Sequence, residues 1–118
     1  MRVSPLPVRY TSHPSYGYLI ETTRQRAAWA PEFWELPQWA AGADLMFADA
    51  AGWNRPIRFA RGVGGHACVR DVAAAAHTAG VRRLVFAHVG RTSIRAIDRG
   101  ERPPFAEWGR DGAESRLR

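Results

Sequence analysis

Leu45-Met46-Phe47-Ala48-Asp49 is a run of four apolar residues that ends in a carboxylate. The run has the length of a strand and carries no helical periodicity. In α/β proteins the reactive side chains are displayed where strands end, because a rigid strand holds them while the loops admit substrate. The sequence therefore predicts a strand over residues 45–48, with Asp49 at its functional end.

The same pattern returns downstream, where the apolar run 84–87 ends in His88. Between the two runs, residues 69–79 carry apolar side chains at helical spacing on one face and charged side chains on another. Gly80 follows as a C-cap. These features predict a strand, a helix and a second strand in succession.

Outward from this unit, residues 8–11 and 16–22 are predicted to be strands that pair around a break at 12–15. Residues 27–30 form a third predicted strand, stopped by Pro31. A short helix is expected over 33–39, and the glycine-rich segment 52–65 is expected to be a loop.

The C-terminal part predicts a short helix over 94–99, capped by Ser93 and closed by Gly100. The tail, 101–118, is expected to be anchored by Phe105 and Trp108 and to add a marginal strand over 114–117. Because no repeat, linker or shift in composition divides the chain, we expect one domain over 1–118. The predicted fold class is α/β, with a mixed sheet covered by helices.

Composition narrows the range of functions. The chain has 118 residues, a net charge of +6 and 17 basic residues, all of them arginine, as in proteins from GC-rich genomes. We interpret them as a solvated surface; an arginine-rich nucleic-acid binder remains an alternative, which predicts steep salt dependence. The single Cys68 excludes an internal disulfide, and no window approaches a signal peptide or membrane span, so we expect a cytoplasmic protein.

Four candidate ligand side chains stand at the ends of apolar runs: Glu32, Asp49, His66 and His88. Carboxylates and imidazoles held in fixed geometry are the ligands of metal-dependent hydrolases. The set is incomplete, because no His-x-His-x-Asp-His cluster occurs in the sequence.

Five motifs, in this order, resemble the C-terminal half of metallo-β-lactamase-fold hydrolases. They are Tyr16-Gly17-Tyr18-Leu19-Ile20-Glu21, Ala30-Pro31-Glu32, Phe47-Ala48-Asp49-Ala50, Gly64-Gly65-His66-Ala67 and Leu84-Val85-Phe86-Ala87-His88. The nearest branch contains the tRNA-processing ribonuclease Z and phosphonate-pathway phosphodiesterases. The resemblance extends from about Val8 to Arg99 and implies half of an αββα sandwich.

The resemblance implies roles for four residues. His88 falls at the position of the last metal-ligating histidine, and Glu32 at that of a bridging aspartate, so Zn²⁺ or Mn²⁺ in a two-metal site is expected. His66 falls where the ribonuclease branch has its leaving-group acid. Asp49 falls at the position of the acidic partner of that histidine, where the branch usually has the longer glutamate.

The family's middle ligand is a histidine that precedes the Gly-Tyr pair. His13 is only four residues before Gly17, whereas Tyr10 and Thr11 occupy the more usual offset. Either His13 acts as this ligand with local rearrangement, or the ligand is absent.

In this family the N-terminal half supplies three histidines and an aspartate. The chain therefore resembles a truncated product, one subunit of a split enzyme or a decayed copy, and its expected partner is the missing half or a second copy of itself. The implied function is hydrolysis of a small-molecule or nucleotide phosphodiester. The alternative is a non-catalytic binding or assembly module that kept the half-fold.

Overall fold

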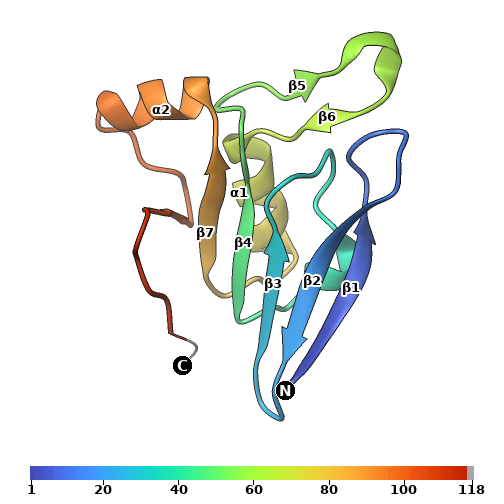
Figure 1. Ribbon diagram of the computed structural model, residues 1–118. Coiled ribbons are helices and arrows are strands. Elements are labelled where there is room, and N and C mark those ends of the chain that lie inside the picture. The colour runs from blue at the N-terminus through green and yellow to red at the C-terminus, as the bar shows by residue number, and fades with distance from the viewer. Residues whose placement is uncertain (117–118) are drawn as a thin grey trace.

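The computed structural model describes residues 1–116 as a mixed six-stranded sheet with two helices (Figure 1). The strand order is β1-β2-β3-β4-β7-β8. The sheet consists of β1 (Arg2–Val8), β2 (Ser15–Glu21), β3 (Arg26–Ala30), β4 (Leu45–Ala50), β7 (Leu84–Val89) and β8 (Glu107–Trp108). The helices are α1 (Val69–Thr78) and α2 (Arg91–Asp98). The predicted α/β class with a mixed sheet is confirmed.

The strand directions bring the functional ends together. β2 is antiparallel to both β1 and β3, whereas β3, β4, β7 and β8 run parallel to one another. Parallel strands present their carboxyl ends at one edge of a sheet. The segments that follow β3, β4 and β7 therefore meet at the same edge.

The two faces of the sheet differ. On one face, Ala28 of β3 pairs with Met46 of β4, which pairs with Leu84 of β7, and these buried side chains pack with the apolar stripe of α1. On the other face, Tyr18 pairs with Trp29 and Trp29 with Phe47. Tyr18 and Trp29 remain 45% and 40% exposed, so the second face carries a row of uncovered aromatic side chains.

The N-terminal strand was predicted in the wrong place. β1 covers Arg2–Val8 instead of residues 8–11, although it contains Pro5 and Pro7. It is an edge strand with β2 as its single neighbour. An edge strand tolerates proline where the missing N–H would have faced away from the neighbour.

The helix predicted over 33–39 is also wrong. Within this region only a 3₁₀ turn, η1 (Gln38–Ala40), forms. The side chain of Phe33 is fully buried, and its N–H donates to a carboxylate oxygen of Asp49 at 3.0 Å. This tertiary anchor, followed by Pro37, holds the segment in an irregular conformation.

The predicted loop 52–65 contains a small hairpin, β5 (Ile57–Arg58) and β6 (Gly65–His66), with the 3₁₀ turn η2 (Ala60–Gly62) between its strands. Two-residue strands are too short to show periodicity in a sequence. The hairpin projects from the functional edge of the sheet (Figure 1).

Helix α1 agrees with its prediction to within one residue. Its C-cap is Ala79 instead of the predicted Gly80, which follows in the left-handed conformation with φ +76°. Helix α2 begins earlier than predicted: Gly90 is its N-cap, and Ser93 is buried inside the helix. The Ser93 hydroxyl has no hydrogen-bond partner among residues 1–116. The capping prediction failed because the serine faces the core.

In the tail, Trp108 lies in β8 and packs on Phe86 and Trp53, as predicted for an anchor. Phe105 remains 67% exposed and stacks on His77. Of the strand predicted over 114–117, residues 114–116 are not a strand, and residue 117 lies outside the described residues. Over the described part of the chain, neither helix has the length and hydropathy needed to cross a membrane.

Candidate metal centre

Three side chains from different segments converge at the functional edge of the sheet. Glu32 follows β3, His88 lies near the end of β7, and His66 ends β6. One ligand atom from each of the three lies within 4.8 Å of the other two. Two imidazoles and a carboxylate at this separation can share one metal ion.

Asp49 supports this cluster from the buried side. Its carboxylate is fully buried and accepts hydrogen bonds from the N–H groups of Phe33 at 3.0 Å and Ala51 at 2.9 Å. The same carboxylate lies 2.7 Å from Nδ1 of His66 and 3.6 Å from Nδ1 of His88. Since an ionised carboxylate only accepts, it favours the proton on Nδ1 of His66 and leaves Nε2 with its lone pair.

The two imidazoles lie face to face, with ring centroids 5.1 Å apart and planes at 20°. Nε2 of His88 is 3.4 Å from Oε1 of Glu32, and both of these side chains are almost half exposed. His66 is 8% exposed. The cluster is therefore supported by the core on one side and reachable from solvent on the other.

Tyr10 contacts the cluster next to His66. Its phenol oxygen lies 3.1 Å from Nε2 of His66. Burial, together with the negative charges of Glu32 and Asp49, raises the pKa of Tyr10 above its usual value. The phenol therefore stays protonated at neutral pH and donates to Nε2 whenever that nitrogen carries no proton.

Sequence reasoning assigned no functional role to Tyr10 or to Phe59. The ring of Phe59 stands edge-on to His66, with centroids 5.6 Å apart. For Tyr10 a signal was present, because it stands near the offset usual for the family's middle histidine.

The structure does not bring His13 into the cluster of Glu32, His66 and His88. His13 is exposed in the loop between β1 and β2, where its backbone N–H donates to the hydroxyl of Thr11 at 3.1 Å. Its position four residues before Gly17 places it out on the loop beyond the end of β1. Of the predicted metal ligands, Glu32 and His88 are therefore together and His13 is apart.

The donor set fits a divalent transition metal. Imidazole nitrogen suits Zn²⁺, and a mixture of imidazole and carboxylate also suits Mn²⁺. Asp49 accepts a hydrogen bond from Nδ1 of His66 and lies 3.6 Å from Nδ1 of His88. A carboxylate behind the imidazoles is the arrangement that orients histidine ligands in metal sites.

No protein-family model matches the chain, and no curated protein sequence matches it. Solved structures that resemble it include the following two. One is the metallo-β-lactamase fold protein YhfI from Bacillus subtilis, with a TM-score of 0.65, 13% identity, and coverage of 94% of this chain and 46% of YhfI. The other is described as a new diphosphatase from the PhnP family, with a TM-score of 0.67, 19% identity, and coverage of 94% of this chain and 41% of that protein.

At these identities the likeness establishes the fold. The sequence-based resemblance to the metallo-β-lactamase fold is confirmed, and so is its partial extent, because the chain spans less than half of the length of either neighbour. The six-stranded sheet with helices is one half of the sandwich.

Proposed function

We propose that this chain contributes one half of the active site of a metal-dependent hydrolase that cleaves a phosphodiester. The observation that carries the proposal is the convergence of Glu32, His66 and His88 within 4.8 Å. The fold shared with a diphosphatase supports the choice of a phosphate ester. A site at the loop-bearing edge of a sheet is also where substrates gain access.

Glu32 and His88 are the proposed metal ligands, with Zn²⁺ or Mn²⁺ as the ion. Both side chains are partly exposed, and Oε1 of Glu32 lies 3.4 Å from Nε2 of His88. An ion could therefore reach these two atoms from solvent. A divalent cation there would supply positive charge to the oxygens of a bound ester.

In its imidazolium form, with a second proton on Nε2, His66 is the proposed proton donor to the leaving oxygen. Asp49, 2.7 Å from Nδ1, stabilises the imidazolium and fixes the ring so that Nε2 faces the site. Tyr10, in contact with that same Nε2, is placed to share the proton. A buried carboxylate with two backbone donors cannot rotate away, which keeps the imidazole oriented for each turnover.

The complete site needs ligands beyond this cluster, since a two-metal centre requires more than three donors. We propose that a second half supplies them and packs on the uncovered aromatic row of Tyr18, Trp29 and Phe47. Exposed aromatic surface of this kind favours association. The partner is either the other half of the sandwich or a second copy of this chain.

Metal analysis tests the proposal. After dialysis against Zn²⁺ or Mn²⁺, the purified chain is analysed by plasma mass spectrometry beside His88→Ala, Glu32→Gln and the control His77→Ala, which alters an exposed histidine outside the cluster. We expect bound metal in the parent and the control and strongly reduced metal in the other two. Equal metal content in the parent and His88→Ala would refute the site.

A second measurement separates ligand from acid. His66→Ala should keep metal and lose turnover of bis(4-nitrophenyl) phosphate, assayed on the assembly isolated through a tag on this chain. If His66→Ala loses metal as completely as His88→Ala, His66 is a ligand and not the acid.

One observation favours a second candidate, a non-catalytic binding or assembly module. His13 is outside the cluster, so the family's middle ligand is not formed by a histidine of this region. This alternative predicts an assembly that forms through the aromatic row but neither holds metal nor cleaves the diester.

A further inference from the structure

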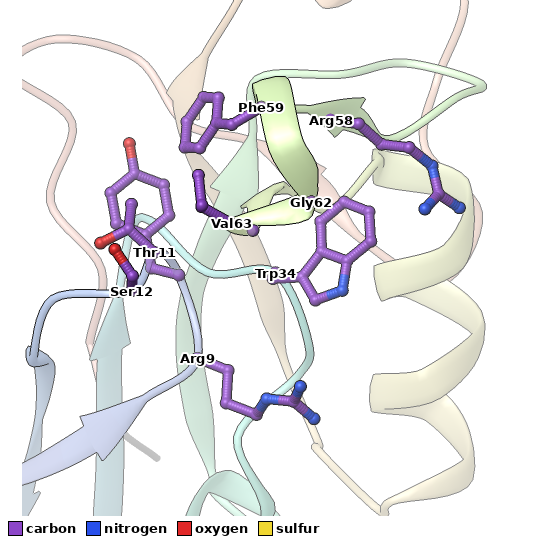
Figure 2. Close-up of a pocket in the computed structure, with 10 residues that line it drawn as sticks. Arg9, Thr11, Ser12, Trp34, Arg58, Phe59, Gly62 and Val63 are labelled. Atoms are coloured by element: carbon purple, nitrogen blue, oxygen red, sulfur yellow. The ribbon is translucent and has the colours of Figure 1, made fainter.

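A cavity of about 550 Å³ lies next to the metal centre, among the loop after β1, the segment after β3 and the β5–β6 hairpin (Figure 2). Tyr10, Trp34 and Phe59 supply aromatic walls, and Arg9 and Arg58 supply positive charge. Its volume falls within the range of small-molecule sites, which combine apolar walls with a few polar groups.

The walls of this cavity are tied to one another. The N–H of Gly65 donates to the carbonyl of Tyr10 at 2.9 Å, which joins the hairpin to the loop after β1. The ring of Phe59 stands edge-on to Tyr10 with centroids 5.7 Å apart. A Cβ at Gly64 would collide with the carbonyl of Tyr10, so glycine permits this close approach. The cavity is therefore formed before any ligand arrives.

The charge of the cavity favours an anion. The guanidinium of Arg58 lies over the indole of Trp34, 5.1 Å from the ring centroid, and residues 1–116 provide it with no salt bridge. Arg9 pairs with Glu35 at 2.9 Å. In Figure 2, Arg9 and Arg58 lie on opposite sides of Trp34. A guanidinium that is held on an aromatic face and free of carboxylate can bind phosphate through two parallel hydrogen bonds.

The cavity shares two of its walls with the metal centre. Tyr10 and Phe59 each contact the ring of His66, with centroid separations of 5.0 and 5.6 Å. A molecule in the cavity would therefore contact Tyr10 and Phe59, the same side chains that contact the imidazole that we assign as the proton donor.

We infer that this cavity binds a nucleotide, with the base against the aromatic walls and the phosphate at Arg58. Aromatic side chains bind every base by stacking, and Arg58 provides the matching anion site. The assignment of this nucleotide as the leaving group rests on the proposed function. In that reaction the bond from phosphorus to the leaving oxygen breaks, water supplies the new oxygen on phosphorus, and the proton lost from His66 is replaced by one from that water.

Calorimetric titration with adenosine 5′-monophosphate, in the presence of EDTA, tests the binding. We expect Trp34→Leu and Arg58→Gln each to weaken binding by about tenfold or more, because each removes one of the two recognition elements. Arg70→Gln, which removes an exposed arginine of α1 outside the cavity, should leave the affinity unchanged. Adenosine and ribose 5-phosphate, each lacking one half of the ligand, should both bind more weakly than the nucleotide.

Urea midpoints of the variants confirm that each is folded. Absence of binding by the folded parent chain, or equal affinities for parent, Trp34→Leu and Arg58→Gln, would overturn the inference. A short oligoadenylate distinguishes the source of the nucleotide: tighter binding than the mononucleotide assigns a strand end, and equal binding assigns a free nucleotide.

The outcomes for the two proposals are separable because EDTA removes metal from the titration. A chain that binds the nucleotide but no metal retains the cavity and refutes the hydrolase. A chain that binds metal but not the nucleotide retains the metal centre and refutes the cavity.

Discussion

Oδ2 of Asp49 lies 2.7 Å from Nδ1 of His66, and Oδ1 of the same carboxylate lies 3.6 Å from Nδ1 of His88. A single buried carboxylate thus faces both histidines of the cluster. Both rings present their Nε2 atoms on the side away from Asp49, toward Tyr10 and Glu32 respectively. The aspartate is the common support of the proton donor and of a metal ligand.

Replacing Asp49 with asparagine should therefore weaken the whole centre. An amide accepts fewer hydrogen bonds than a carboxylate, and the stability lost should be about 1.5–3 kcal/mol. Loss of such a support for a ligating histidine typically lowers metal affinity about 10–100-fold. Urea denaturation and competition with a chelating dye measure the two effects. Asp98→Asn, at an exposed position of α2, is the control, and a metal affinity equal to that of the parent would contradict this role.

The hairpin that carries His66 depends on Gly65. A Cβ at this position would collide with the carbonyl of Ile57, and φ is +155°. We expect Gly65→Ala to displace His66 and therefore to lower turnover of bis(4-nitrophenyl) phosphate while bound metal is kept. Gly62→Ala on the same hairpin meets no atom within 4 Å, so its cost is that of the left-handed conformation alone, about 1–2 kcal/mol. Turnover and urea midpoints compare the two variants; equal turnover would show that the hairpin tolerates the collision.

The thiol of Cys68 should resist modification while the chain is folded. The side chain is fully buried, and burial raises the pKa of the thiol above its usual value. Since the thiolate is the reactive form, reaction with a disulfide reagent requires local opening. At pH 8 we expect the native rate to be at least about a hundredfold below the rate in guanidinium. A rapid native reaction would mean that the segment before α1 opens readily.

The ion pair between Arg83, the residue before β7, and Glu107 of β8 predicts a pH dependence of stability. Arg83 donates two hydrogen bonds to Glu107, at 2.6 and 3.0 Å, and these hold the pKa of Glu107 below its usual value. A lowered pKa in the folded state means that this stabilisation is present above the unfolded value, 4.5. It is lost as the pH falls through the lower folded value.

Arg83→Gln should consequently be less stable than the parent at pH 7, and the difference should disappear as the pH falls through the lowered pKa of Glu107. Urea midpoints of the two chains across this range measure the effect, and Arg70→Gln controls for removal of one positive charge. The effect is expected to be small because both side chains are substantially exposed. A difference that grows on acidification would contradict the sign.

Regular elements with many apolar residues were predicted well. The strands at 45–48 and 84–87 and the helix at 69–79 agree with β4, β7 and α1, because burial on a sheet and on a helical stripe leaves a periodic signal. The segments that failed are those fixed by distant contacts. Phe33 is anchored by Asp49, Ser93 faces the core, and β1 depends on pairing with β2 despite its prolines.

The sequence by itself determined the order of the apolar runs and the identity of the reactive side chains at their ends, and with these the partial metallo-β-lactamase fold. The tertiary structure decided which of those side chains meet. It brought Glu32, His66 and His88 together over Asp49, left His13 on a loop, and introduced Tyr10 and the arginine-lined cavity. The physical reason is that periodic burial is local along the chain, whereas the distance between two ligands depends on strand direction and on the path of the loops that join the strands.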